Sequence, residues 1–136
     1  MAWLELPGEI ADSQGTVRVA GTFYLDGPTL MGYVLSQLHL SQFDNTDAGA
    51  SVAGSATVTI RTISGKGTAN VVLDGTGSAF VQIKYSVDGG ADTLIATSDQ
   101  AVMVALAFAT SLVLKAVNTD AASHNRAGVS STGVTG

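Results

Sequence analysis

The chain has 136 residues, a formal net charge of −5 and no cysteine, and only 12% of its residues are charged. This length suits one domain, and the core can form without disulfides because 46% of the residues are hydrophobic. The absence of cysteine excludes thiol nucleophiles and cysteine-ligated zinc. The six Lys and Arg residues are scattered singly, so we expect neither nucleic acid nor an anionic membrane as a partner.

Residues 1–15 are predicted to form an N-terminal arm. The segment lacks a basic region and carries Glu5 within its apolar part, so we do not expect a secretory signal. No stretch of the chain has eighteen uninterrupted apolar residues, which argues against a membrane span. We therefore expect the protein to be made and folded in a cytoplasm.

The first predicted strand is Thr16–Leu25, in which apolar residues alternate with others until an Asp-Gly-Pro cluster ends it. Residues Thr29–Phe43 are ambiguous. A stripe of leucine and valine at helical spacing favours a helix. Gly32 weakens a helix, and the alternation of Leu38 and Leu40 with polar residues indicates a strand, which we favour.

Asp44–Ser55 is small, polar and glycine-bearing, which predicts a loop and the best internal boundary. Beyond it, β-branched residues predict a strand over Ala56–Ile63, and a glycine-rich turn precedes another strand that ends at Asp74-Gly75. Regular alternation then predicts a hairpin within Phe80–Ala96, with a turn at Asp-Gly-Gly where positive φ angles are needed.

In that hairpin, Val81, Ile83, Tyr85 and Val87 are expected to share one face. Ala101–Ala109 is apolar at every position and predicts either a buried strand or a short helix. Ser111–Asp120 predicts a strand with its leucines and Ala116 turned inward.

These elements together predict an all-β protein, an antiparallel β-sandwich of immunoglobulin-like or jelly-roll type with extended N- and C-terminal segments. The single sandwich domain is expected to cover residues 16–122. Residues 123–136 are small and polar, and we expect them to form a C-terminal tail that is loose or docks on a neighbouring subunit.

The stretch FVQIKYSVDGGADTL resembles the C strand and following turn of fibronectin-III-like and other immunoglobulin-like modules, and SLVLKAVNTDAAS resembles their F strand. The resemblance covers residues 67–128. The chain departs from the family pattern at two places, because it lacks the tryptophan of the B or C strand and the tyrosine early in the F strand. Such modules more often bind partners or act as spacers than catalyse reactions, so the resemblance implies a binding or scaffolding role.

The whole chain also resembles small bacteriophage virion proteins, such as capsid decoration (cement) proteins and fibres. The resemblance is one of type, carried by cysteine-free, charge-poor stretches such as VVLDGTGSAF and AASHNRAGVSSTGVTG. It implies location in the virion, assembly in the host cytoplasm, and contact with the major capsid protein or other virion subunits. It also implies a homo-oligomer, such as a trimer.

Residues that could carry chemistry are few and isolated. The two histidines, at 39 and 124, do not predict a metal site, and no G-x-S-x-G motif is present for a serine hydrolase. Asp44, Asn45 and Asp47 form one acidic group and Asp88 and Asp92 another, but aspartate and asparagine are also ordinary turn residues. We therefore expect neither an enzyme nor a cofactor or metal site.

The function predicted from these observations is a virion structural protein that bridges coat subunits, and the alternative is a carbohydrate- or receptor-binding module of a phage fibre or bacterial surface protein. The candidate partner-contact residues are Trp3, Leu4, Tyr24, His124 and Arg126.

Overall fold

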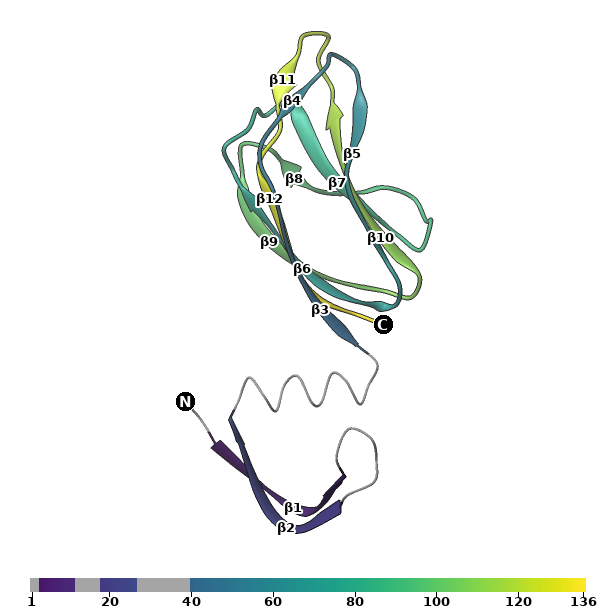
Figure 1. Ribbon diagram of the computed structural model, residues 1–136. Coiled ribbons are helices and arrows are strands. Elements are labelled where there is room, and N and C mark those ends of the chain that lie inside the picture. The colour runs from purple at the N-terminus through teal and green to yellow at the C-terminus, as the bar shows by residue number, and fades with distance from the viewer. Residues whose placement is uncertain (1–2, 12–17, 27–39) are drawn as a thin grey trace. The chain divides into compact units, whose positions relative to one another are not determined.

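The structure is a computed structural model that describes residues 3–11, 18–26 and 40–136 (Figure 1). The chain divides into two units, Met1–Leu40 and Ser41–Gly136. In the first, β1 (Trp3–Ala11) pairs antiparallel with β2 (Arg18–Asp26), from Trp3 opposite Asp26 to Ala11 opposite Arg18.

The unit boundary differs from the prediction. Residues 3–11, which were predicted to form an arm, are a strand whose backbone pairs with β2 along one side. The sandwich begins at Ser41, not at residue 16. Of the ambiguous segment Thr29–Phe43, residues 29–39 lie outside the described part of the chain, and Ser41–Phe43 open a strand.

The second unit is an antiparallel β-sandwich, as predicted. One sheet has the strand order β3-β12-β6-β9 and the other has the order β5-β10-β7-β8, while a small ladder joins β4 to β11. The strands are β3 (Ser41–Asp47), β4 (Ser51–Val52), β5 (Thr57–Ser64), β6 (Gly67–Asp74), β7 (Val81–Val87), β8 (Thr93–Thr97), β9 (Ala101–Phe108), β10 (Ser111–Asn118), β11 (His124–Asn125) and β12 (Val129–Thr135).

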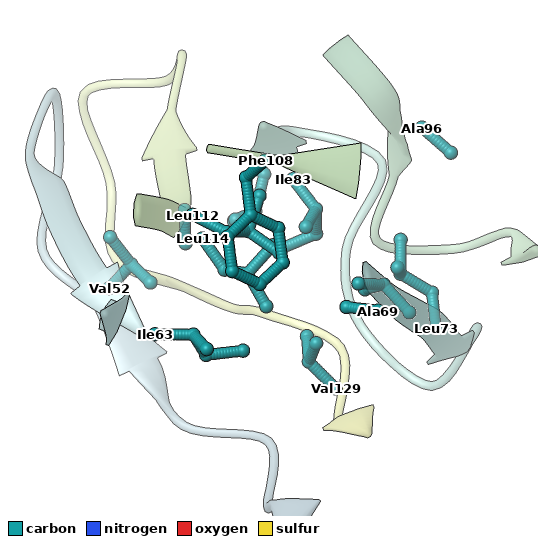
Figure 2. Close-up of a cluster of buried hydrophobic side chains, with 13 residues drawn as sticks. Val52, Ile63, Ala69, Leu73, Ile83, Ala96, Phe108, Leu112, Leu114 and Val129 are labelled. Carbon is teal, nitrogen blue, oxygen red and sulfur yellow. The ribbon is translucent and has the colours of Figure 1, made fainter. Parts of the chain in front are cut away.

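The core lies between the two four-stranded sheets (Figure 2). On one side are alternate residues of β6, including Val71 and Leu73, and on the other are Leu112 and Leu114 of β10; all four are at most 1% exposed. The predicted inward face of β7 is confirmed, because Val81, Ile83, Tyr85 and Val87 either belong to this core or pack against it. Alternation therefore predicted the orientation of the central strands correctly.

The turn after β7 also follows the prediction. Asp88 and Gly89 have φ angles of 54° and 71°, and the Gly90 N–H donates to the Val87 carbonyl at 2.9 Å. Two successive positive φ angles are the geometry of a type I′ turn, which an Asp-Gly pair favours. The segment Ala101–Ala109, predicted as either strand or helix, forms the strand β9.

Two predicted loops are strands in the structure. The predicted loop Asp44–Ser55 contains the end of β3 and all of β4. The predicted C-terminal tail contains β11 and β12, and β12 lies inside a sheet, with β3 on one side and β6 on the other. The residues of these segments are mostly small and polar. Such side chains do not obstruct the backbone hydrogen bonds that hold the strands in their sheets.

The resemblance to immunoglobulin-like modules holds for one strand pair. β7 and β10, the C-like and F-like strands, are neighbours, as C and F are in those modules. The last strand, β12, departs from that arrangement, because it pairs with β6 in the opposite sheet and not with the F-like strand β10.

Candidate interaction surfaces

One end of the sandwich is built from the loops around β4 and β11, and Asn118 holds these loops together. Its side chain is buried, and Nδ2 donates to the carbonyl oxygens of Val52, Ala53 and Ala122 at 3.0, 3.2 and 2.8 Å. Its Oδ1 accepts the N–H of Asp120 at 3.0 Å. A single side chain therefore joins the residues that follow β10 to the Val52–Ala53 segment, which is distant in sequence.

His124, a predicted contact residue, lies in this loop end. Its Nε2 is 2.7 Å from Oδ2 of Asp120, and its ring lies 4.7 Å from the ring of Phe80, centroid to centroid, at an interplanar angle of 32°. The hydrogen bond from His124, together with the backbone N–H groups of Ala121 and Ala122, lowers the pKa of Asp120. Because Asp120 is then an ionised acceptor, we assign the proton to Nε2.

Phe80, Asp120 and His124 form a cluster in which Phe80 is the exposed side chain. Phe80 is 51% exposed, although its carbonyl accepts both the N–H and the hydroxyl of Thr119 at 2.9 Å. A carboxylate and an imidazole are also two parts of a serine triad, but no described serine is hydrogen-bonded to His124. The geometry is that of a rigid aromatic platform.

Arg126, the second predicted contact residue in this region, is used by the fold. Its Nη1 donates to the carbonyl of Ala127 at 3.0 Å, and its backbone N–H donates to the carbonyl of Ala50 at 2.9 Å. Its charge also helps to lower the pKa of Asp47, whose largest stabilising contact is the hydrogen bond from Arg61.

The Arg61–Asp47 pair joins the two sheets at one open edge. Nε and Nη2 of Arg61 donate to the two carboxylate oxygens of Asp47 at 2.7 and 2.8 Å. Arg61 lies on β5 and Asp47 on β3, which are edge strands of opposite sheets. This two-point geometry is the strongest form of an arginine–carboxylate contact.

The remaining predicted contact residues lie in the other unit. Trp3 and Leu4 belong to β1 and Tyr24 to β2, where Trp3 is in register with Asp26 and Tyr24 with Glu5. The predicted set is therefore divided between two units, and only His124 and Arg126 belong to the sandwich.

Of the acidic residues grouped in the sequence, Asp88 and Asp92 both have structural contacts. Asp88 accepts hydrogen bonds from the backbone N–H groups of Ala109, Thr110 and Ser111 at distances from 2.6 to 3.1 Å, which lowers its pKa to about 2. Its carboxylate therefore closes the turn between β9 and β10. Asp92 pairs with Lys115 at 2.8 Å. Within the described residues no three metal-ligating side chains gather into one group.

A second surface, which sequence analysis missed, is the outer face of the sheet β3-β12-β6-β9. We call it the uncharged face. Its large exposed apolar residues are Val72 of β6 and, directly opposite it, Met103 of the edge strand β9, which are 41% and 72% exposed. Its two charged residues are Asp44, midway along the edge strand β3, and Asp74, at the end of β6. The other residues at its outward positions are neutral: Gln42, Thr46, Thr68, Asn70, Val72, Ala101, Met103, Ala105, Ala107, Ser130, Thr132 and Val134.

The uncharged face continues into a shallow groove at β3. The groove has a volume of about 450 Å³ and is lined by Gln42, Phe43, Asp44, Thr132, Gly133 and Val134. Strand order creates this face, because it places the apolar strand β9 beside β6 and the small polar residues of β12 next to both. No local sequence signal indicates such an arrangement.

No family model and no curated protein sequence matches the chain. One solved structure to which the chain shows similarity is described as the structure of infectious bursal disease virus Gx strain. The similarity covers 94% of this chain and 36% of that chain, with a TM-score of 0.35 and 13% sequence identity. This chain thus spans little more than a third of the viral chain. Among the residues that the structure describes, no helix is long and apolar enough to cross a membrane.

Proposed function

We propose that the protein is a non-enzymatic structural protein of a virion, a capsid decoration protein that binds the outside of a coat and bridges its subunits. The observation that carries the proposal is the uncharged face. Exposed surfaces of soluble proteins are usually rich in charge, and charge is depleted where a surface is buried against another subunit. A broad face with two aspartates, no basic residue, and an exposed methionine and valine has this character.

The rest of the described sandwich supports a binding role. The loop end is fixed by Asn118, and one open edge is fixed by the Arg61–Asp47 pair, so the framework around the face is rigid. Rigid surfaces lose little conformational entropy on binding. Repetition of one modest contact over a symmetric lattice then gives high avidity.

The test is cosedimentation of the full chain with shells of the coat protein that is encoded in the same genome. We expect the chain to pellet with the shells and to saturate at a fixed number of copies per coat subunit. Val72→Lys places a charge among the exposed apolar residues of the uncharged face and should reduce binding by at least about tenfold.

Leu94→Lys is the matched control, since Leu94 is 50% exposed but lies on β8 in the other sheet. It should bind like the unaltered protein. A chain that stays in the supernatant, or equal losses in the two variants, would contradict the proposal.

A second candidate function is carbohydrate or receptor binding, and the exposed Phe80 ring favours it. Aromatic rings held at a loop end can stack on the apolar faces of sugars. A glycan panel tests this candidate directly, with Phe80→Ala beside Trp3→Ala and Tyr24→Ala. Binding that is lost only in Phe80→Ala would favour the loop end, and the absence of any glycan signal would remove this candidate.

A further inference from the structure

The strand β9 is an edge strand without a single charged residue. It runs from Ala101 to Phe108 with the sequence AVMVALAF, and at about 3.4 Å per residue it spans about 27 Å. One side pairs with β6 along the whole strand. On the other side no described strand is paired with it, so alternate N–H and C=O groups are available for a further strand.

The other three edge strands of the sandwich are protected against such pairing. β3 carries Asp44 and Asp47, and β5 carries Arg61 and a register shift against β10. β8 has only five residues and a register shift against β7. Charges, bulges and short length are the usual means by which edge strands avoid new partners. β9 has none of them.

The outward positions of β9 also allow a close approach. Ala101, Ala105 and Ala107 are small and exposed, and Met103 is flexible and 72% exposed. Side chains of this size offer no steric obstacle to a neighbouring strand in the plane of the sheet. A charged side chain at any of these positions would be free to extend into water, so their neutrality is not required by the fold.

We propose that β9 of one copy pairs antiparallel with β9 of a second copy, which joins two four-stranded sheets into one continuous sheet of eight strands. A chain with a net charge of −5 repels its own copies at most surfaces. Pairing of β9 with itself brings no like charges together, because the strand has none. The inference does not depend on the virion role, since two copies can pair in this way whatever the uncharged face binds.

The symmetry of this contact sets the number of copies. Two identical strands that pair antiparallel are related by a two-fold axis, so the contact is complete with two copies. We place the axis near the middle of the strand, at Val104 or Ala105, where the number of backbone hydrogen bonds is greatest. The protein is then a dimer or a multiple of two, and not the trimer suggested by the resemblance to decoration proteins.

Sedimentation velocity on the full chain tests the proposal. We expect the parent protein to be a dimer at about 100 µM. The double variant Met103→Lys/Ala105→Lys should be a monomer at the same concentration, because its dissociation constant for the dimer is raised at least about tenfold. In the paired strands the introduced lysines of the two copies are cross-strand neighbours, and their repulsion opposes pairing. Both positions are exposed, so circular dichroism of the double variant should match that of the parent.

Val72→Lys is the matched control, since it lies on the same face but on the inner strand β6. It should remain a dimer. Loss of the dimer in Val72→Lys to the same degree would instead indicate that two copies stack face to face. A monomeric parent at about 100 µM, or a trimer, would also overturn the proposal.

Chemical cross-linking gives an independent result, because the chain contains no cysteine. Ala105→Cys should give covalent dimers with a short bismaleimide reagent, because the axis brings the two thiols close together. Thr62→Cys, exposed on β5 in the other sheet, should give none above the level of random collision. Equal cross-linking at the two sites would contradict pairing through β9.

Discussion

Replacement of Asn118 by alanine tests whether one side chain holds the loop end of the sandwich. Asn118 is 2% exposed, and its two N–H donors are shared by three carbonyl oxygens while its Oδ1 accepts the N–H of Asp120. The change removes the equivalent of three hydrogen bonds, each contributing about 0.5–1.5 kcal/mol, and leaves the buried carbonyl of Val52 without this donor. We expect the free energy of unfolding to fall by about 3 kcal/mol.

Urea unfolding followed by far-UV circular dichroism measures this loss. Thr119→Ala is the matched control, because the neighbouring residue is exposed and its hydroxyl makes one hydrogen bond, to the carbonyl of Phe80. It should cost about 0.5 kcal/mol. Asn118→Asp should cost more than Asn118→Ala at neutral pH, because it places a carboxylate oxygen beside three carbonyl oxygens. Equal stability of Asn118→Ala and Thr119→Ala would refute the assigned role.

Three further predictions concern single contacts. Asp88→Asn should increase hydrogen exchange at the Thr110 amide, because a neutral amide is a weaker acceptor than a carboxylate. The pKa of Asp88 is lowered from 3.8 to about 2, so the stabilisation from its charge is complete above pH 3.8 and is lost as the pH falls through 2. Amide exchange measured across that pH range should show this loss in the parent protein but not in Asp88→Asn. Arg61→Ala should lower the free energy of unfolding by about 1 kcal/mol, and less at high salt, whereas a salt-independent loss would argue against an electrostatic contribution from Asp47. Gly133→Ala should reduce the yield of folded protein, because the new Cβ would collide with the carbonyl oxygen of Thr68 in β6, and normal thermal stability would contradict this packing.

The strands that sequence predicts well are those with one buried face. In β7 large apolar residues alternate with polar ones, and in β10 every second residue from Leu112 to Asn118 is buried. A shift by one residue would expose Ile83 or Leu114 to water. This cost fixes both the existence and the orientation of each strand. The turn at Asp88-Gly89 is equally local, since its positive φ angles favour these residue types.

The strands that sequence misses gain their stability from distant partners. The inward positions of β12 include Ser131 and Gly133, which bury little apolar area and resemble loop residues. Gly133 is required because β12 approaches Thr68 too closely for a side chain. Only the finished ladder with β3 and β6 reveals this, and a single sequence does not show which strands are neighbours.

The candidate surfaces also differ in whether local sequence or the pairing of distant strands creates them. The structure places His124 and Arg126 at the loop end, where Asp120 and the Ala127 carbonyl engage them, and their contact with a partner stays a prediction. The uncharged face was missed because it is made of neutral residues from four strands. Its recognition requires strand order, and Val72 lies opposite Met103 only after β6 and β9 have paired.

The position of β12 between β3 and β6 has a consequence for the order of events during protein synthesis. Translation proceeds at about 5–20 residues per second, so several seconds separate the emergence of β3 from that of β12. Throughout that interval β3 has no partner in its sheet, and β6 can pair with β9 on only one side. Nascent chains on neighbouring ribosomes would then expose adhesive edges at the same moment. We therefore expect soluble yield to depend on ribosome density and on chaperones that shield nascent strands, even when the finished sandwich is stable.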